Sequence, residues 1–250
     1  MATIDLNCDL GESFGNFRVG NDEEVLSLVT SANVATGFHA GDPLVMLTTV
    51  RNAKANSVRI GAHVGYRDLA AFGRRFIDYD LDQLTAEVLY QIGALQAACR
   101  ASGTEVEYVK PHGALYNRIA RDAKQAQAVI AAMKLADPQL ALMGLAGSPV
   151  LAWAEEAGLS TISETFADRA YENDGSLVPR SQPGAVHESV DEAAGQALNF
   201  ALGEPITAVD GTKVSVAADS ICVHGDNPHA LTVVRTIRDT LTKNGIAVSS

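Results

Sequence analysis

The sequence predicts an α/β fold in which short parallel strands alternate with longer helices. Its 250 residues match the usual size of a (β/α) barrel domain. Short β-branched or apolar runs alternate along the chain with segments of helical periodicity. Four of the six histidines follow such a run directly, where a parallel strand would end. Because the carboxyl ends of parallel strands meet on one rim, we expect these histidines to share one site.

Seven short apolar runs are predicted as parallel strands. They cover residues 3–8, 32–36, 58–62, 106–109, 140–144, 159–162 and 220–223. Such β-α alternation produces a parallel sheet with right-handed crossovers. Seven strands over this length could close as a barrel or stay open as a doubly wound sheet, and their spacing does not separate the two.

Helices are predicted where apolar residues recur every three or four positions, most clearly over 81–99 and 231–241. Three pairs place a capping side chain before a proline at the first helical position: Asp42-Pro43, Ser148-Pro149 and Asn227-Pro228. The repeating unit is therefore strand, loop and helix.

Two stretches break this alternation. Residues 206–216 contain the turn Val209-Asp210-Gly211-Thr212 and are predicted as a hairpin before the last parallel strand. Residues 164–187 are predicted as one long loop. Loops of this length are usually functional or disordered, so this one is either a substrate lid or a solvated excursion without a role.

Composition limits the class of protein. The formal net charge of −11 disfavours nucleic acid as a partner, because phosphate binding requires clustered Lys and Arg. No apolar run approaches the roughly 18 residues of a membrane span, and residues 2–7 lack the features of a signal peptide. We therefore expect a cytoplasmic protein with one domain over residues 1–250. Cys8, Cys99 and Cys222 are widely spaced in apolar segments, which indicates buried reduced thiols.

The end of the first strand carries the first candidate site residues. Asn7, Asp9 and Glu12 are polar where a barrel would otherwise pack apolar side chains, and Asp9 is best placed as a base or metal ligand. With His39 and His63, Asp9 would supply one carboxylate and two imidazoles, a ligand set common in hydrolytic metal sites. A metal-free acid-base cluster would use the same three residues, and both alternatives stay open.

Further candidates follow later strands. Lys110 and His112 suit an oxyanion or a phosphate. Arg169, next to Asp168, and Arg180 could hold a substrate carboxylate or, equally, fix the loop by ion pairs. Other polar residues at strand ends are candidates for substrate binding: Asp42, His224 and Asp226. His187 and His229 have no comparable context and are predicted as surface residues.

Taken together, the motifs resemble those of one known family, LamB/YcsF. The resemblance spans nearly the whole chain and rests on these segments: Asn7-x-Asp9-Leu10-Gly11-Glu12, Phe38-His39-Ala40-Gly41-Asp42, Gly61-Ala62-His63, Lys110-Pro111-His112-Gly113, Phe166-Ala167-Asp168-Arg169, Asp174-Gly175-Ser176 and Cys222-x-His224-Gly225-Asp226. One difference is visible after His63, where many members read Pro-Ser-Phe-Pro-Asp and this chain reads Val64-Gly65-Tyr66-Arg67-Asp68. This difference in residues 64–68 affects the shape and charge expected beside His63.

The resemblance implies a seven-stranded (β/α) barrel like those of glycoside hydrolases and polysaccharide deacetylases. It also implies ATP-dependent opening of 5-oxo-L-proline to L-glutamate with two further 5-oxoprolinase subunits, B and C. The chain has no G-x-x-x-x-G-K-[ST] loop, which agrees with ATP as a co-substrate handled with those partners.

For this reaction we expect Asp9 or a neighbouring histidine to activate water and Lys110 to stabilise negative charge. His63 or His112 would protonate the departing nitrogen, and Arg169 or Arg180 would hold the carboxylate. One alternative function is a stand-alone metal-dependent hydrolase or deacetylase acting on a carbohydrate or amide. Another is a binding protein that holds a ligand for chemistry on another chain.

Overall fold

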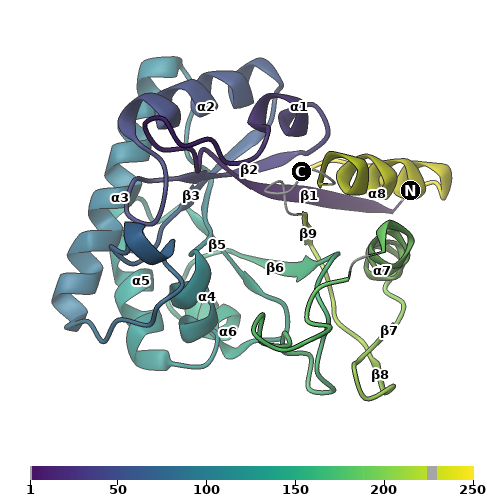
Figure 1. Ribbon diagram of the computed structural model, residues 1–250. Coiled ribbons are helices and arrows are strands. Elements are labelled where there is room, and N and C mark those ends of the chain that lie inside the picture. The colour runs from purple at the N-terminus through teal and green to yellow at the C-terminus, as the bar shows by residue number, and fades with distance from the viewer. Residues whose placement is uncertain (1, 188, 224–229) are drawn as a thin grey trace.

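Seven parallel strands form a closed barrel at the centre of the molecule (Figure 1). The computed structural model describes residues 2–187, 189–223 and 230–250. The barrel strands are β1 (Thr3–Leu10), β2 (Ser31–Ala35), β3 (Arg59–His63), β4 (Tyr108–Val109), β5 (Ala141–Leu145), β6 (Thr161–Phe166) and β9 (Ser220–Val223). Each strand pairs with its neighbour in parallel, and pairing of β1 with β9 closes the ring. The predicted α/β class is confirmed, and the closure decides for a barrel over an open sheet.

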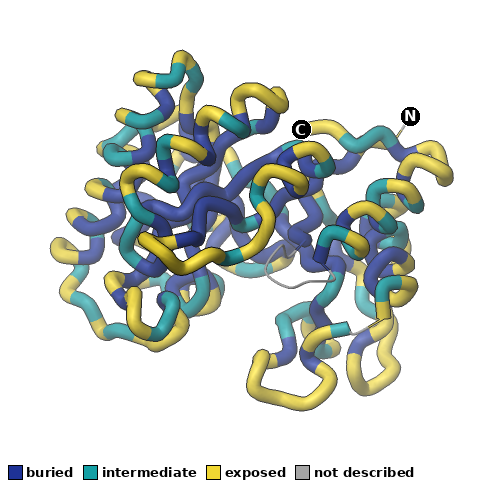
Figure 2. The backbone as a smooth tube through the Cα atoms, turned by 45° about the horizontal axis from the view of Figure 1, so that its top comes forward, coloured by how far each residue is buried: buried dark blue, intermediate teal, exposed yellow. Residues whose placement is uncertain are grey.

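Helices surround the barrel and separate it from solvent (Figure 1). They are α1 (Asp22–Leu26), α2 (Pro43–Ala55), α3 (Leu81–Ser102), α4 (Gly113–Ile119), α5 (Ala123–Ala136), α6 (Pro149–Glu156), α7 (Val190–Leu202) and α8 (Ala230–Lys243), with a 3-10 turn at Leu69–Ala71. The predicted apolar stripe of α3, which includes Leu84, Val88 and Ile92, is buried. Figure 2 shows the buried backbone gathered at the centre and the exposed backbone on the outer helices and loops.

Alternation along β1 determines which side chains enter the barrel. Leu6 and Cys8 belong to the hydrophobic core between strands and helices. Asp5, Asn7 and Asp9 alternate with them and hydrogen-bond to side chains of other strands. Because successive side chains of a strand point to opposite faces, the polar residues of β1 all point into the barrel.

One glycine makes room for a side chain that crosses this interior. A Cβ on Gly61 would lie 2.1 Å from the ring of Tyr108 on the neighbouring strand. The Tyr108 hydroxyl donates to Asn33 Oδ1 at 2.7 Å. Only glycine at position 61 leaves room for the tyrosine ring on its way to Asn33.

The sixth strand differs from the sequence prediction. The apolar run predicts a strand over residues 159–162, but β6 runs Thr161–Phe166, so the predicted loop loses its first three residues to the strand. Glu164 and Thr165 are polar and therefore resemble loop residues, yet both are fully buried. The physical reason is that each polar group has a partner: Glu164 faces Lys110 in the barrel interior, and the Thr165 hydroxyl on the other face donates to the carbonyl oxygen of Ser220.

Three smaller expectations also have an outcome. The predicted hairpin exists as β7 (Ile206–Thr207) and β8 (Lys213–Val214), which pair antiparallel. Asp42 caps α2 through the backbone N–H groups of Leu44 and Val45, as predicted. Ser148 does not cap α6, because its hydroxyl donates to the carbonyl oxygen of Leu145 instead. Asn227 lies outside the described residues.

Two further features follow the composition. Cys8, Cys99 and Cys222 are all buried and free, as expected of reduced thiols. Within the described part of the chain, none of the helices combines the length and apolar character needed to cross a membrane.

A short strand, β10 (Ala247–Val248), pairs in parallel with the start of β1.

Candidate active site

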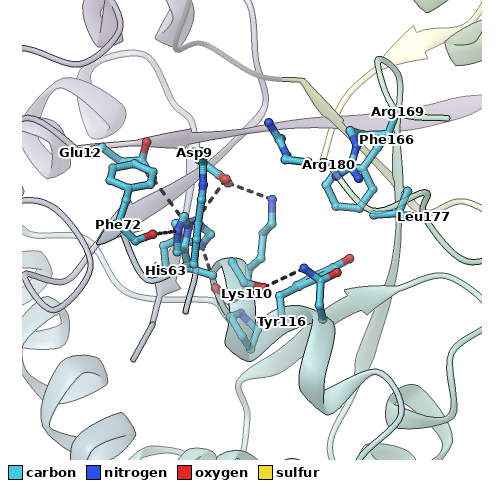
Figure 3. Close-up of a pocket in the computed structure, with 15 residues that line it drawn as sticks. Asp9, Glu12, His63, Phe72, Lys110, Tyr116, Phe166, Arg169, Leu177 and Arg180 are labelled. Carbon is cyan, nitrogen blue, oxygen red and sulfur yellow. Dashed lines mark hydrogen bonds and ion pairs between the residues drawn. The ribbon is translucent and has the colours of Figure 1, made fainter. Parts of the chain in front are cut away.

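A pocket opens at the carboxyl ends of the barrel strands (Figure 3). Asp9, His63 and Lys110 lie close together on one side, and Phe166, Arg169 and Leu177 lie on the other. Seven of the residues predicted from the sequence line this pocket: Asp9, Glu12, His63, Lys110, His112, Arg169 and Arg180. Residues at the carboxyl ends of β1, β3, β4 and β6, and just after them, thus meet on one rim, as expected for a parallel barrel.

Lys110 is the central cation of the site. Its Nζ lies 2.9 Å from Asp9 Oδ1 and 2.7 Å from Glu164 Oε1, and it donates to Asn7 Oδ1 at 3.2 Å. Burial alone would lower the pKa of Lys110, but the negative charge of Asp9 and the other acidic neighbours outweighs it and holds the pKa well above its usual value. Lys110 therefore remains an ammonium at neutral pH.

Asp9 is the partly open member of the same group. Asn33 Nδ2 donates to its Oδ1 at 2.8 Å, and its Oδ2 lies 3.2 Å from His63 Nε2. Burial raises the pKa of Asp9, but the positive charges of His63 and Lys110 more than compensate and hold it well below its usual value. The side chain remains 19% exposed, so an ionised carboxylate reaches the pocket.

Three histidine rings pack against one another beside Asp9. The rings of His39 and His112 stack with centroids 3.8 Å apart, and His63 meets both edge-on. Burial, together with the neighbouring histidines, holds the pKa of His39 well below its usual value. The same causes lower the pKa of His112 to about 3. His39 and His112 are therefore neutral at physiological pH.

Glu12 completes this cluster. Its Oε1 lies 3.5 Å from His39 Nε2 and 3.9 Å from His112 Nδ1. Glu12, His39, His63 and His112 each offer one ligand atom, and these atoms lie within 4.8 Å of one another. This group differs from the predicted set of Asp9, His39 and His63, since it contains Glu12 and His112 in place of Asp9, whose Oδ1 pairs with Lys110.

The arginines of the segment after β6 have separate surroundings. Arg169 is buried, and its guanidinium donates to the carbonyl oxygens of Ala185 and Val178 at 3.2 and 2.6 Å. Burial, followed by the charge of Arg180, lowers the pKa of Arg169. The sequence left two roles open for Arg169, holding a substrate carboxylate or fixing the loop. Direct contacts support the second role, and they are made with backbone carbonyls. Asp168 is not among the residues that line the pocket.

The remaining predicted residues are distributed elsewhere. Asn7 lies below the pocket and accepts hydrogen bonds from Asn33 and Lys110. Asp42 accepts from the backbone N–H of Gly15 in addition to capping α2, and does not line the pocket. His187 is half-buried, with Gln196 and Glu192 as partners. His224, Asp226 and His229 lie outside the described residues.

Sequence reasoning missed Glu164 and Tyr116. Glu164 is fully buried against Lys110, and Tyr116 lines the pocket with its pKa raised well above the usual value by burial and by Glu164. The available signal was the alternation Ile162, Glu164, Phe166, which continues the strand period beyond the predicted boundary.

Comparison with known proteins gives a consistent assignment. The model of the LamB/YcsF family matches residues 4–250. The 5-oxoprolinase A subunit of Corynebacterium efficiens is 61% identical over 246 residues, which cover 98% of this chain and 96% of that protein. The crystal structure of the lactam utilization protein from Thermus thermophilus superposes with a TM-score of 0.94 at 45% identity and covers 99% of both chains. A family 4 carbohydrate esterase from Streptomyces lividans, at 14% identity and a TM-score of 0.50, shares the fold alone and covers 100% of this chain and 92% of that one.

Proposed function

Because the chain belongs to the LamB/YcsF family, we propose that it is the A subunit of an ATP-dependent 5-oxoprolinase. In this proposal it opens the lactam ring of 5-oxo-L-proline to yield L-glutamate, together with subunits B and C. Relatives that are 51–61% identical over nearly their full length are named as the A subunits of 5-oxoprolinases, which supports the role. The observation that carries the proposal is the Asp9–Lys110 pair that lines the pocket.

The reaction explains why ATP and partner chains would be needed. An unstrained amide is stabilised by resonance, and its nitrogen is a poor leaving group. Phosphorylation of the amide oxygen by ATP would create a better electrophile. The sequence contains no G-x-x-x-x-G-K-[ST] loop, so we assign ATP handling to a site completed by the partner subunits.

Asp9 and Lys110 divide the work at the ring carbonyl. The ionised Asp9 accepts a proton from water, and the resulting hydroxide attacks the carbonyl carbon. Lys110, held as an ammonium, stabilises the negative charge of the phosphorylated oxygen during the attack. As the carbon–nitrogen bond breaks, the proton taken by Asp9 passes to the departing nitrogen and an acyl phosphate remains. A second water then hydrolyses the acyl phosphate to L-glutamate and inorganic phosphate.

Other residues refine this assignment. Of the two histidines predicted as acids, His112 is unsuited, because a pKa of about 3 leaves it unprotonated at neutral pH. Arg169 also has a structural role, because two of its guanidinium nitrogens donate to loop carbonyls, and either arginine could hold the substrate carboxylate. Both arginines line the pocket.

The test is glutamate release from 5-oxo-L-proline by this chain, alone and mixed with candidate B and C subunits, with and without ATP. We expect release only when ATP and both partners are present. Absence of release with folded, associated partners would overturn the proposal. The same assay with Arg180→Lys tests the clamp, for which we expect a raised KM and a smaller change in kcat.

The cluster of Glu12 and three histidines favours one alternative, a stand-alone metal-dependent hydrolase or deacetylase. That function predicts hydrolysis of an amide or of an acetylated sugar without ATP or partners, and its loss on addition of a chelator. The assay above distinguishes the two functions directly, since they differ in their requirement for ATP.

A further inference from the structure

A second cavity, a groove, adjoins the active-site pocket. Its volume is about 570 Å³, which falls within the range of about 300–1,000 Å³ typical of small-molecule sites. The groove and the pocket share six lining residues: Arg74, Gly113, Asn117, Arg169, Leu177 and Arg180. A ligand bound in the groove would therefore reach the pocket that Asp9 and Lys110 line.

The lining of this groove is strongly cationic. Among the described residues it includes four arginines, Arg74, Arg121, Arg169 and Arg180, and one acidic residue, Asp174. The whole chain carries a formal net charge of −11, so the excess of cations here is not a property of the general surface. The carboxylate of Asp174 already accepts a hydrogen bond from a backbone N–H of its own loop at 2.9 Å. The groove is thus suited to an anion that carries several charges.

Arg169 has donors to spare for such an anion. The residue is only 6% exposed, and its Nε and Nη2 donate to the carbonyl oxygens of Ala185 and Val178. Its third nitrogen, Nη1, makes no hydrogen bond to a described residue. A guanidinium carries five N–H donors in one plane and matches the geometry of a phosphate. Because two backbone carbonyls fix this guanidinium, its remaining donors are held in place before a ligand binds.

The beginning of α6 adds backbone donors to the same groove. Gly147, Ser148 and Pro149 line the groove at the point where the helix starts. Ser148 does not cap the helix with its side chain, because its hydroxyl donates to the carbonyl oxygen of Leu145. The first N–H groups of a helix carry a partial positive charge and commonly bind phosphate. The arginines and the helix are independent features, and both favour the same class of ligand.

We propose that this groove binds the phosphate chain of a nucleoside triphosphate, with the terminal phosphate at the junction with the pocket. A single carboxylate, such as that of 5-oxo-L-proline, requires one guanidinium, whereas a chain of phosphates occupies several. Since Arg169 and Arg180 line both cavities, one of them can hold the substrate carboxylate while the other contacts the terminal phosphate.

The inference rests on the proposed function, in which ATP phosphorylates the amide oxygen. In that step the oxygen bonds to the terminal phosphorus, the bond from this phosphorus to the bridging oxygen breaks, and ADP leaves with the electron pair. A phosphate chain in the groove would bring its terminal phosphorus to the pocket where the lactam binds. This arrangement assigns the phosphates to this chain, and the base and ribose to the site completed by the partner subunits.

The first experiment measures binding of magnesium AMP-PNP, a non-hydrolysable analogue of ATP, to the full chain by calorimetry. Inorganic tripolyphosphate should compete with it. AMP, which has the same base and sugar but one phosphate, should bind at least about tenfold more weakly. Arg74→Gln/Arg121→Gln should weaken binding of AMP-PNP at least about tenfold. The matched control is Arg51→Gln/Arg100→Gln, which makes the same change in net charge outside both cavities and should change binding less than about twofold.

Thermal melting of each variant, compared with the parent, checks that it folds. Absence of AMP-PNP binding by the parent, equal binding of AMP, or equal losses in the two double variants would overturn the proposal.

The assembled enzyme separates this inference from the proposed function. Arg121 lines the groove but not the pocket, so Arg121→Gln should raise the KM for ATP about fivefold and leave the KM for 5-oxo-L-proline unchanged. Glutamate release that depends on ATP, with an unchanged KM for ATP in the variant, would contradict this inference alone. A parent that binds AMP-PNP in the groove but releases no glutamate would contradict only the proposed function.

Discussion

Two aspartates on β1 face the same barrel interior but differ in their partners. Asp5 accepts hydrogen bonds from the hydroxyls of Thr30, Ser31 and Ser220, two of them at 2.6 and 2.7 Å, and is 5% exposed. Asp9, four residues further along the strand, contacts Lys110, Asn33 and His63 and opens to the pocket. One carboxylate is enclosed by neutral hydroxyls, and the other shares its charge with a cation and an imidazole.

The difference teaches that burial of a polar residue does not by itself identify an active site. Hydroxyl donors satisfy Asp5 completely and contribute to stability. Asp9 lines the pocket, and His63 and Lys110 hold it ionised, so its carboxylate carries no proton and is able to accept one. We expect substitution of Asp5 to affect unfolding and substitution of Asp9 to affect turnover.

The largest effect should come from Lys110→Met. Removing the ammonium leaves Asp9 and Glu164 without their buried cation, which should destabilise the fold by about 3–5 kcal/mol. Loss of oxyanion stabilisation should also lower kcat about 10²–10³-fold. Chemical denaturation and glutamate release by the assembled enzyme measure the two consequences.

The double variant Lys110→Met/Glu164→Gln separates these consequences. Neutralising Glu164 should recover much of the lost stability, because the amide carries no charge to desolvate. Activity should remain low, since the cation is still absent. Recovery of both would show that Lys110 acts only by packing.

Asp9→Asn should come next. The amide keeps the shape of the side chain but cannot accept a proton from water, so we expect activity to fall about 10²–10⁴-fold. The melting temperature should change little. Full activity of Asp9→Asn in the assembled enzyme would exclude Asp9 as the base.

Asp5→Asn is the matching substitution at the other aspartate of β1. Replacing a carboxylate that accepts three hydroxyls should cost about 1–3 kcal/mol of unfolding free energy. The kcat/KM value should stay close to that of the parent. A large loss of activity without a loss of stability would contradict the distinction drawn between Asp5 and Asp9.

Asp42→Ala should have the smallest effect. Asp42 caps α2, so its loss should cost about 1 kcal/mol. Hydrogen bonds from the backbone N–H groups of Val45 and Gly15 lower the pKa of Asp42. Folding lowers the pKa of Asp42, so the stabilisation by its carboxylate is present above the ordinary pKa of about 3.9. This stabilisation is lost as the pH falls through the lowered pKa of the folded protein.

Denaturation of the parent and of Asp42→Ala at neutral and acidic pH measures this difference, which should shrink on acidification. The variant also tests the prediction that Asp42 binds substrate. A raised KM would support it, and an unchanged KM would leave Asp42 as a capping residue alone.

Much of the fold was predictable because it depends on local patterns. Alternation of apolar runs and helical stripes predicted all seven barrel strands, and Asp42-Pro43 predicted the start of α2. The hairpin at 206–216 followed from its turn residues. The end of β6 was missed because a polar strand interior has the composition of a loop.

The candidate site was predictable only in part. The sequence by itself determined that Asp9, His63 and Lys110 end strands and share a rim, because parallel strands direct their carboxyl ends to one side. It also determined the polar and apolar alternation of β1, since a strand has a period of two.

Closure of the barrel, the burial of Glu164 against Lys110, and the choice of Glu12 and His112 as companions of His39 and His63 were decided by the tertiary structure alone. Distances between residues on different strands depend on the stagger and twist of the closed sheet, which no local pattern contains. Which groups touch, and hence which charges and lone pairs must be satisfied together, follows from that geometry.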